Sequence, residues 1–110
     1  MSSVFEELAN LDRLIHEPAR LAVLTALDSC QKTDFIFLQR LTGLSAGNLS
    51  VHLSKLEDAE LVRMEKKIVA KRTQTQVQIT EKGHAAIIKY WAKIEALRAG
   101  AENWQMTEED

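Results

Sequence analysis

The chain has 110 residues, of which 45% are hydrophobic and 27% are charged, with a formal net charge of -2 and a pI near 5.9. This length and composition predict one globular domain, and no apolar stretch approaches the roughly 20 residues that a membrane span needs. The start of the chain lacks the layout of a secretory signal, and Cys30 is the only cysteine, so we expect a cytoplasmic protein without disulfides.

The charges are unevenly distributed along the chain. Residues 61–74 carry five bases and one acid, whereas residues 101–110 carry four acids and no base. Phosphate binding requires only a local basic stripe, so the negative net charge does not exclude a nucleic-acid partner. We expect residues 1–100 to form the folded domain and residues 101–110 to form an acidic, flexible tail.

Apolar spacing predicts two helices in the first part of the chain. Apolar residues recur at helical spacing from Phe5 to Ile15, which predicts a first helix over residues 5–15. Pro18 suits the first turn of a new helix, so a second helix is predicted over residues 18–28. This second helix is apolar around most of its circumference, and we expect it to be the central buried helix.

The segment after the second helix begins with a polar linker, residues 29–33. A short third helix is predicted over residues 34–42, with Leu38 and Leu41 facing inward. Thr33 or Asp34 is suited to cap this helix, because a short polar side chain can accept hydrogen bonds from the first turn.

A fourth helix with two different faces is predicted over residues 45–59. Ser45 is a good N-cap for it, and Leu49, Leu53 and Leu56 recur at the i, i+4, i+7 spacing of a buried stripe. The opposite face is small and polar. It carries Gly47, Val51, Ser54 and Asp58, and it is flanked by Asn48, Ser50 and Lys55.

The third and fourth helices together form a predicted helix-turn-helix. In that motif the second helix enters the major groove of DNA, where short hydrogen-bonding side chains meet base edges and phosphates. The alternative is that the Ser- and Asn-rich face is simply solvated.

After residue 60 the apolar pattern changes from helical to alternating. Two strands are predicted over residues 61–68 and 75–80, joined by a loop at residues 69–74. This basic hairpin lacks the Asn-Gly or Asp-Gly pair of a tight turn, so a long connecting loop is expected. Its candidate DNA contacts are the bases Lys66, Lys67, Lys71 and Arg72.

A long closing helix is predicted over residues 81–99, capped by Thr80 and ended by Gly100. Its apolar stripe is broader than one small domain is expected to cover, which favours a dimer interface formed with the first helix. The candidate interface residues are Phe5, Leu8, Leu11, Ile87, Ile88, Trp91 and Ile94.

This order of elements resembles the winged helix-turn-helix transcriptional regulators of the MarR and ArsR type, over residues 11–97. The most specific stretches are residues 44–62, Lys71-Arg72-Thr73 and residues 79–83. Glu60 stands where the family commonly has glycine, and Thr73 stands where many relatives have proline. The resemblance implies a mainly α fold with a small antiparallel β-hairpin, the wing, and a long terminal dimerisation helix.

The resemblance also implies sequence-specific binding of double-stranded DNA by a homodimer that regulates transcription. Helix 45–59 would enter the major groove, with Asn48 able to pair with adenine and Val51 able to touch a thymine methyl group. The basic wing 66–74 would meet the backbone or the neighbouring minor groove. MarR-like relatives often bind small ligands near their long helices, so an effector is an open possibility.

The sequence favours no catalytic or metal site. His16, His52 and His84 are scattered without a second ligand at metal-binding spacing, and Cys30 lacks the cysteine partner that some metal-sensing ArsR-like relatives use. Phosphate-binding loops and nucleophile motifs are also absent from the sequence, so we expect no enzyme and no cofactor. The alternative function, which the acidic overall balance favours, is a winged-helix module that binds proteins instead of DNA.

Overall fold

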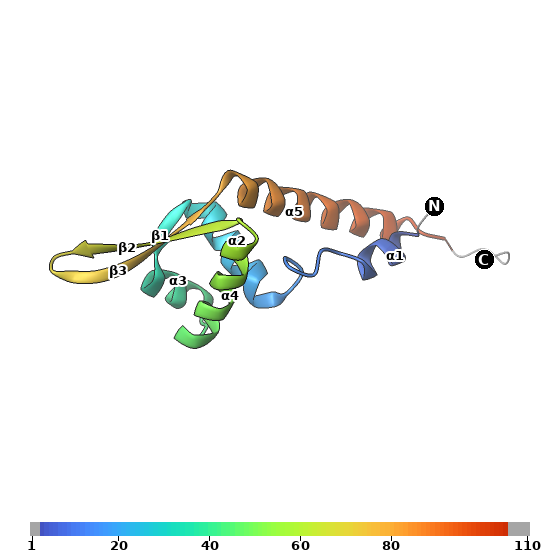
Figure 1. The fold of residues 1–110 in the computed structure, drawn as a ribbon. Coiled ribbons are helices and arrows are strands. Elements are labelled where there is room, and N and C mark those ends of the chain that lie inside the picture. The colour runs from blue at the N-terminus through green and yellow to red at the C-terminus, as the bar shows by residue number, and fades with distance from the viewer. Residues whose placement is uncertain (1–2, 106–110) are drawn as a thin grey trace.

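The computed structural model describes residues 3–105 as an elongated chain whose helical body lies between a projecting hairpin and a long helix (Figure 1). The predicted fold class is confirmed, because this part of the chain is mostly helical and carries a small antiparallel sheet before a long C-terminal helix. Its elements are α1 (Val4–Ala9), α2 (Pro18–Cys30), β1 (Lys32–Asp34), α3 (Phe35–Thr42), α4 (Ala46–Asp58), β2 (Val62–Val69), β3 (Arg72–Ile79) and α5 (Glu81–Glu102).

The core surrounds α2, as predicted. Val23, Leu24 and Leu27 of α2 are fully buried, and α2 contacts α3, α4, α5 and the sheet. The leucine stripe of α4 packs into the same core. Among the helices that the structure describes, none is long and apolar enough to cross a membrane.

Polar side chains begin the helices at the positions that the sequence indicated. Asp34 accepts a hydrogen bond from the N–H of Phe37 at 2.8 Å, and Ser45 accepts one from Asn48 at 3.1 Å. Thr80 accepts one from the N–H of Gly83 at 2.9 Å. These contacts confirm the predicted caps of α3, α4 and α5, because each satisfies an N–H that has no partner within its helix.

The sheet has three strands in the order β1-β3-β2, so the prediction of a two-stranded hairpin was incomplete. Residues 29–33 are not a linker, because α2 continues to Cys30 and β1 begins at Lys32. Lys32 pairs with Gln78, and Asp34 pairs with Gln76, both in antiparallel register. A three-residue strand that depends on a partner more than forty residues away leaves no local pattern in the sequence.

The predicted end of the first helix was wrong. The first helix ends at Ala9 because Asn10 caps it, with its side-chain amide donating to the carbonyl of Glu6 at 2.8 Å. Leu11 and Ile15, which follow in a non-helical segment, are buried in the core.

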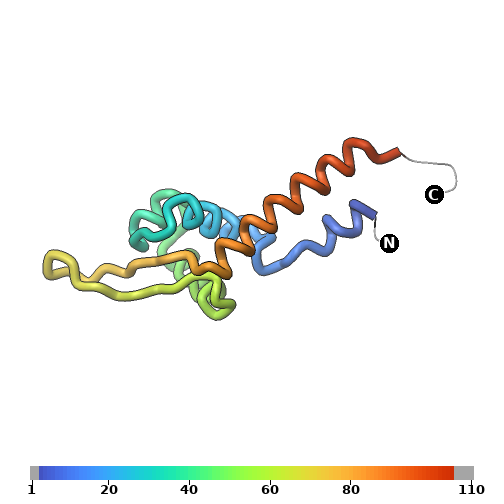
Figure 2. Tube along the Cα trace, turned by 90° about the horizontal axis from the view of Figure 1, so that it is seen from above, coloured from blue at the N-terminus to red at the C-terminus, as the bar shows by residue number. Residues whose placement is uncertain are grey.

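The closing helix continues through Gly100 to Glu102 and crosses the domain boundary predicted at residue 100. Figure 2 shows α1 lying beside the C-terminal part of α5, away from the other helices. At this contact a Cβ on Gly100 would lie 3.5 Å from Val4 Cγ2, and Trp104 meets Phe5 edge to face with ring centroids 5.3 Å apart. The part of α5 that extends beyond the predicted end therefore packs against α1. Most of the predicted acidic tail, residues 106–110, lies outside the described residues.

The wing, defined here as the β2–β3 hairpin, closes through a two-residue turn at Ala70 and Lys71 instead of the expected long loop. Val69 pairs with Arg72, and both turn residues have positive φ, 51° for Ala70 and 65° for Lys71. Two positive φ values are the signature of a type I′ turn, whose twist matches that of paired strands. The turn therefore forms without the usual Asn-Gly pair, at a conformational cost to both residues.

Candidate nucleic-acid interface

The outer face of α4, defined as Ser45, Gly47, Asn48, Ser50, Val51, Ser54 and Lys55, is exposed at every position. Val51 has 54% of its surface accessible, which is high for an aliphatic side chain near the middle of a helix. The structure therefore brings all seven predicted contacts of this helix onto one accessible surface.

The opposite face of α4 is held by the core. Leu49, Leu53 and Leu56 are fully buried, which confirms the predicted stripe. Gly43 makes the turn before the helix at φ 71°, a left-handed conformation that glycine adopts without steric penalty. The helix is thereby fixed in rotation, so its outer face points away from the protein.

A side contact fixes α4 to α2 near its middle. Arg20 Nη1 donates to His52 Nδ1 at 3.1 Å, and Arg20 Nε donates to the carbonyl of Leu14 at 2.6 Å. Burial opposes ionisation of Glu17, but hydrogen bonds from the N–H groups of Arg20 and Ala19 and the nearby charges of His52 and Arg20 lower its pKa below the ordinary value. His52 thus hydrogen-bonds within the fold. In the described part of the chain no three His, Cys, Asp or Glu side chains are grouped to hold a metal ion.

The C-terminal end of α4 is joined directly to the wing. Glu57 Oε2 accepts a hydrogen bond from the N–H of Met64 in β2 at 2.9 Å. Glu60 turns the chain with φ 65°, so the residue that replaces the family's glycine occupies a position that favours glycine. Helix α4 and the wing are therefore joined by a side-chain hydrogen bond as well as by the turn at Glu60.

The start of α5 completes this joint, which we call the junction (Glu60, Leu61, Thr80 and Gly83). The hydroxyl of Thr80 donates to the carbonyl of Glu60 at 2.7 Å, and its N–H donates to the carbonyl of Leu61 at 3.0 Å. Gly83 packs so closely here that a Cβ on it would lie 2.1 Å from the oxygen of Leu61. A glycine is required because α5 begins directly against the backbone that leaves α4.

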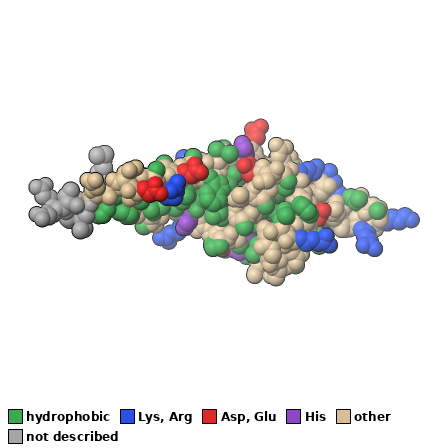
Figure 3. Space-filling model, turned by 180° about the vertical axis from the view of Figure 1, so that it is seen from behind, with side chains coloured by type: hydrophobic (Ala, Val, Ile, Leu, Met, Phe, Trp, Pro, Cys, Tyr) green, Lys and Arg blue, Asp and Glu red, His purple; other side chains and the backbone are tan. Residues whose placement is uncertain are grey.

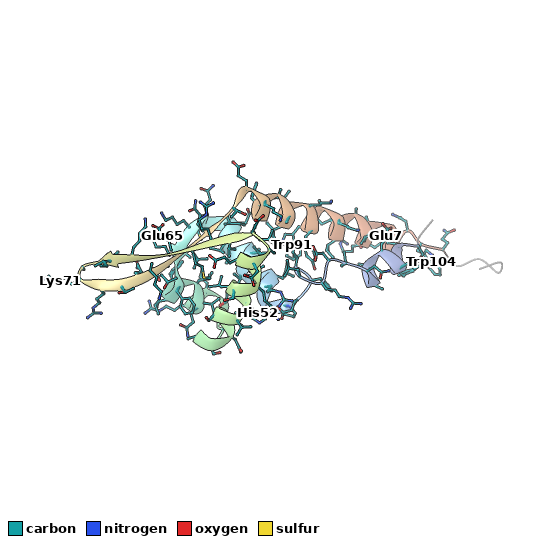
Figure 4. All side chains as sticks on the ribbon, viewed as in Figure 1. Glu7, His52, Glu65, Lys71, Trp91 and Trp104 are labelled. Atoms are coloured by element: carbon teal, nitrogen blue, oxygen red, sulfur yellow. The ribbon has the colours of Figure 1, made fainter. Side chains whose placement is uncertain are left out.

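The wing carries the predicted bases away from the helical body, and Figure 4 shows Lys71 at its far end. Lys66, Lys71 and Arg72 are exposed. Lys67 differs because it is half-buried and its Nζ lies 4.0 Å from Glu65 Oε2, which partly offsets its charge. Figure 3 shows Lys and Arg side chains gathered along the wing, beside hydrophobic side chains.

The seven candidate dimer residues fall into two groups. Phe5, Ile88 and Trp91 are 47%, 51% and 40% exposed, and Leu8 and Ile94 are half-buried. Leu11 and Ile87 are only 6% and 1% exposed, because they pack within the core of the chain. The structure thus brings part of this set to the surface and places the rest behind it.

Sequence reasoning missed several features of this surface. Glu57 was not singled out, because a carboxylate that binds a strand seven residues later has no local signature. Leu41 was expected to face inward but is 54% exposed on α3, where Ile36 and Phe37 are exposed as well. Ile68, in the wing, is 80% exposed, and only its position among basic residues hinted at such a placement.

Comparison with known proteins agrees with this geometry. Residues 19–98 match the family described as the winged helix DNA-binding domain. An uncharacterized protein of Methanocaldococcus jannaschii is 30% identical over 90 residues, which are 82% of this chain and 98% of that protein. The transcriptional regulator homologue protein from Pyrococcus horikoshii has a TM-score of 0.80 at 28% identity, over 89% of this chain and 96% of that chain.

The fold also matches a MarR-family transcriptional regulator from Silicibacter pomeroyi, with a TM-score of 0.64 at 20% identity over 96% of this chain and 68% of that chain. This match confirms the predicted likeness in fold to MarR-type regulators. The chain therefore belongs to the winged helix DNA-binding domain family and has the fold of MarR-type transcriptional regulators.

Proposed function

We propose that the protein is a transcriptional regulator that binds double-stranded DNA sequence-specifically as a homodimer. The observation that carries the proposal is the accessible outer face of α4 next to a wing on which Lys66, Lys71 and Arg72 are exposed, with both elements tied to one junction. The family and the fold support a DNA-binding transcriptional regulator, a class of protein that is typically not enzymatic.

In this proposal α4 lies in the major groove and supplies sequence discrimination. Asn48 can form a bidentate pair with adenine, and the exposed methyl groups of Val51 can contact the methyl group of thymine. The outer face has no arginine to fork onto guanine. Discrimination is therefore expected to depend strongly on DNA shape as well as on direct contacts.

The wing supplies much of the affinity. Lys66, Lys71 and Arg72 are exposed on a hairpin that projects beyond the helices, where they can approach the phosphates flanking the major groove (Figure 4). Lys67 contributes less in this scheme because Glu65 already faces its ammonium group. The chain as a whole is negatively charged, so the wing is the cationic site to which phosphates are attracted.

A homodimer would use the apolar surface of α5 and α1. Phe5, Ile88 and Trp91 are large side chains that the single chain leaves accessible, whereas Leu11 and Ile87 lie in its core. Two protomers related by a two-fold axis would place their α4 helices in half-sites about 34–36 Å apart, one turn of DNA. Residues 1–100 would then contain both the DNA-binding and the dimerisation elements.

Salt dependence tests the proposal. Fluorescence anisotropy with mixed-sequence duplex should show log affinity falling linearly with log salt concentration, because protein bases that neutralise phosphates release counterions. Reversing two wing bases, Lys71→Glu with Arg72→Glu, is expected to weaken binding roughly a hundredfold and to reduce the slope by about 1 for each phosphate that is no longer neutralised. Selection from random duplexes should enrich a common sequence if binding is specific.

The matched control is Lys89→Glu with Lys93→Glu, which makes the same charge change on exposed positions of α5. This control should retain nearly all the affinity of the original protein. Equal losses in both double variants would show that only net charge matters and would remove the wing from the proposal.

The exposed Ile36, Phe37 and Leu41 on α3 favour a second candidate, a module that binds proteins. Such a module would hold its partner by apolar contacts, so its affinity would depend weakly on salt. Absence of salt-dependent duplex binding would favour this candidate over DNA binding.

A further inference from the structure

Near its tip the wing exposes two adjacent aliphatic side chains that the proposed phosphate contacts do not use. Ile68 is 80% exposed, more than any other large hydrophobic residue in the described part of the chain, and Val69 is 48% exposed. Single exposed aliphatic residues are common and need no explanation. Two neighbouring ones at the end of a hairpin that projects from the body are less ordinary, because folding leaves both accessible to solvent.

Ile68 lies on the side of the hairpin that faces the helices. Side chains alternate along a strand, so Ile68 shares a face with Val62 and Met64. Val62 is 2% exposed and belongs to the core, and Met64 packs against the core. Met64 is also the strand residue bound by Glu57 of α4. The same face therefore continues from the body, where α4 covers it, to an uncovered tip at Ile68.

Basic residues surround this aliphatic tip. Lys66 precedes Ile68 by two residues on the same face, and Arg72 pairs across the hairpin with Val69. Lys71 stands in the turn between them. A partner that fits this surface would carry negative charge on both sides of a groove whose floor can contact an aliphatic side chain. The minor groove of DNA has that layout, with two phosphate rails flanking a floor of base edges and sugars.

We propose that Ile68 is an apolar wedge that the wing places in the minor groove, where it discriminates A·T pairs from G·C pairs. This inference rests on the proposed function and names a specificity determinant within it. Guanine projects its N2 amino group into the minor groove, and an aliphatic side chain offers that donor no acceptor. Adenine and thymine leave the floor open to apolar contact, and isoleucine is among the side chains that minor-groove proteins insert.

The test separates the groove floor from the phosphates. Binding of the full chain is measured by anisotropy competition with poly(dG-dC) and poly(dI-dC). An inosine–cytosine pair keeps the major groove of G·C but lacks the N2 amino group of guanine. The original protein is expected to bind poly(dI-dC) roughly tenfold more tightly than poly(dG-dC), because only the former admits the wedge.

The decisive variants are Ile68→Thr and Ile68→Val. The threonine and valine side chains have the same shape, but threonine has a hydroxyl group where valine has a methyl group. Ile68→Val should keep most of the preference, whereas Ile68→Thr should abolish most of it. Both should keep the salt slope of the original protein, since an apolar side chain releases no counterions. Ile36→Thr makes the same substitution at a comparably exposed isoleucine of α3, 54% exposed, and should leave the preference unchanged.

The outcomes distinguish the wedge from the proposed function. Equal preference in Ile68→Thr and Ile68→Val, with salt-dependent binding intact, would overturn the wedge and leave the DNA-binding proposal standing. Absence of salt-dependent binding by the original protein would overturn both. Thermal melts followed by circular dichroism should coincide for all these proteins, because the side chains they change are largely solvated in the folded protein.

Discussion

The two parts of the proposed DNA interface, α4 and the wing, are stabilised in different ways. Helix α4 is backed by three fully buried leucines and by the hydrogen bond of Arg20 with His52. The outer half of the wing has cross-strand pairs but little of the core behind it, and its turn holds Ala70 and Lys71 at positive φ. The difference indicates that α4 is held more rigidly than the outer half of the wing.

The largest expected effect is a difference in the free energy of unfolding between side-chain truncations in α4 and in the wing. Leu53→Ala should lower the free energy of unfolding by about 3 kcal/mol, because it leaves a cavity in the core beneath α4. Ile68→Ala should change it by less than about 0.5 kcal/mol, since the side chain is already solvated. Urea unfolding followed by circular dichroism measures both values. Similar losses in the two variants would mean that the wing is as well packed as the helix.

An intermediate effect is expected at the strained residues of the two parts. Glu60→Gly should raise the free energy of unfolding by about 0.5 kcal/mol, because relief of left-handed strain exceeds the entropy that glycine adds to the unfolded chain.

Ala70→Asn should leave global stability unchanged and should slow amide hydrogen exchange in the wing, since asparagine tolerates this conformation and the wing opens locally.

The reverse substitution at the turn before α4 is the control. Gly43→Ala should destabilise the protein by about 1 kcal/mol, because alanine is strained at φ 71° even though a Cβ there would meet open space. If Glu60→Gly and Gly43→Ala changed stability in the same direction, left-handed strain would not explain either value.

The smallest expected effect concerns the side contact of α4 and depends on pH. The pKa of Glu17 is lowered in the folded protein, so its ionised form contributes stability that is present at neutral pH. This contribution disappears as pH falls below the ordinary value of 4.5 and through the lowered value. Glu17→Gln should therefore melt below the original protein at pH 7, and the difference in melting temperature should shrink in acid. A constant difference across this range would contradict the assigned role of the carboxylate.

Local patterns predicted α4 and its surroundings well because its signals are close together in sequence. A cap at Ser45 and leucines at helical spacing require no knowledge of distant residues, and burial of the stripe determines which face remains outside. The bases of the wing were found for the same reason. Glu57 and β1 were missed, because each depends on packing or pairing with other segments.

The ends of the helices and strands also depend partly on local sequence and partly on contacts with distant segments. Local sequence indicated that a helix begins at residue 81, but packing against α1 accompanies its passage through Gly100. A polar segment indicated a linker, yet pairing with β3 makes part of it a strand. In the wing, cross-strand pairing and twist impose a tight turn on Ala70 and Lys71, which have no local preference for it.

The sequence by itself determined the helical elements, the caps, the polar face of α4 and the segregation of charge, since these follow from the period and chemistry of neighbouring residues. Only the tertiary structure decided that α4 and the wing share one junction, that Leu11 and Ile87 belong to the core, and that Ile68 is exposed. Those properties arise from close approach between segments far apart in the chain, where packing and backbone pairing override local preference.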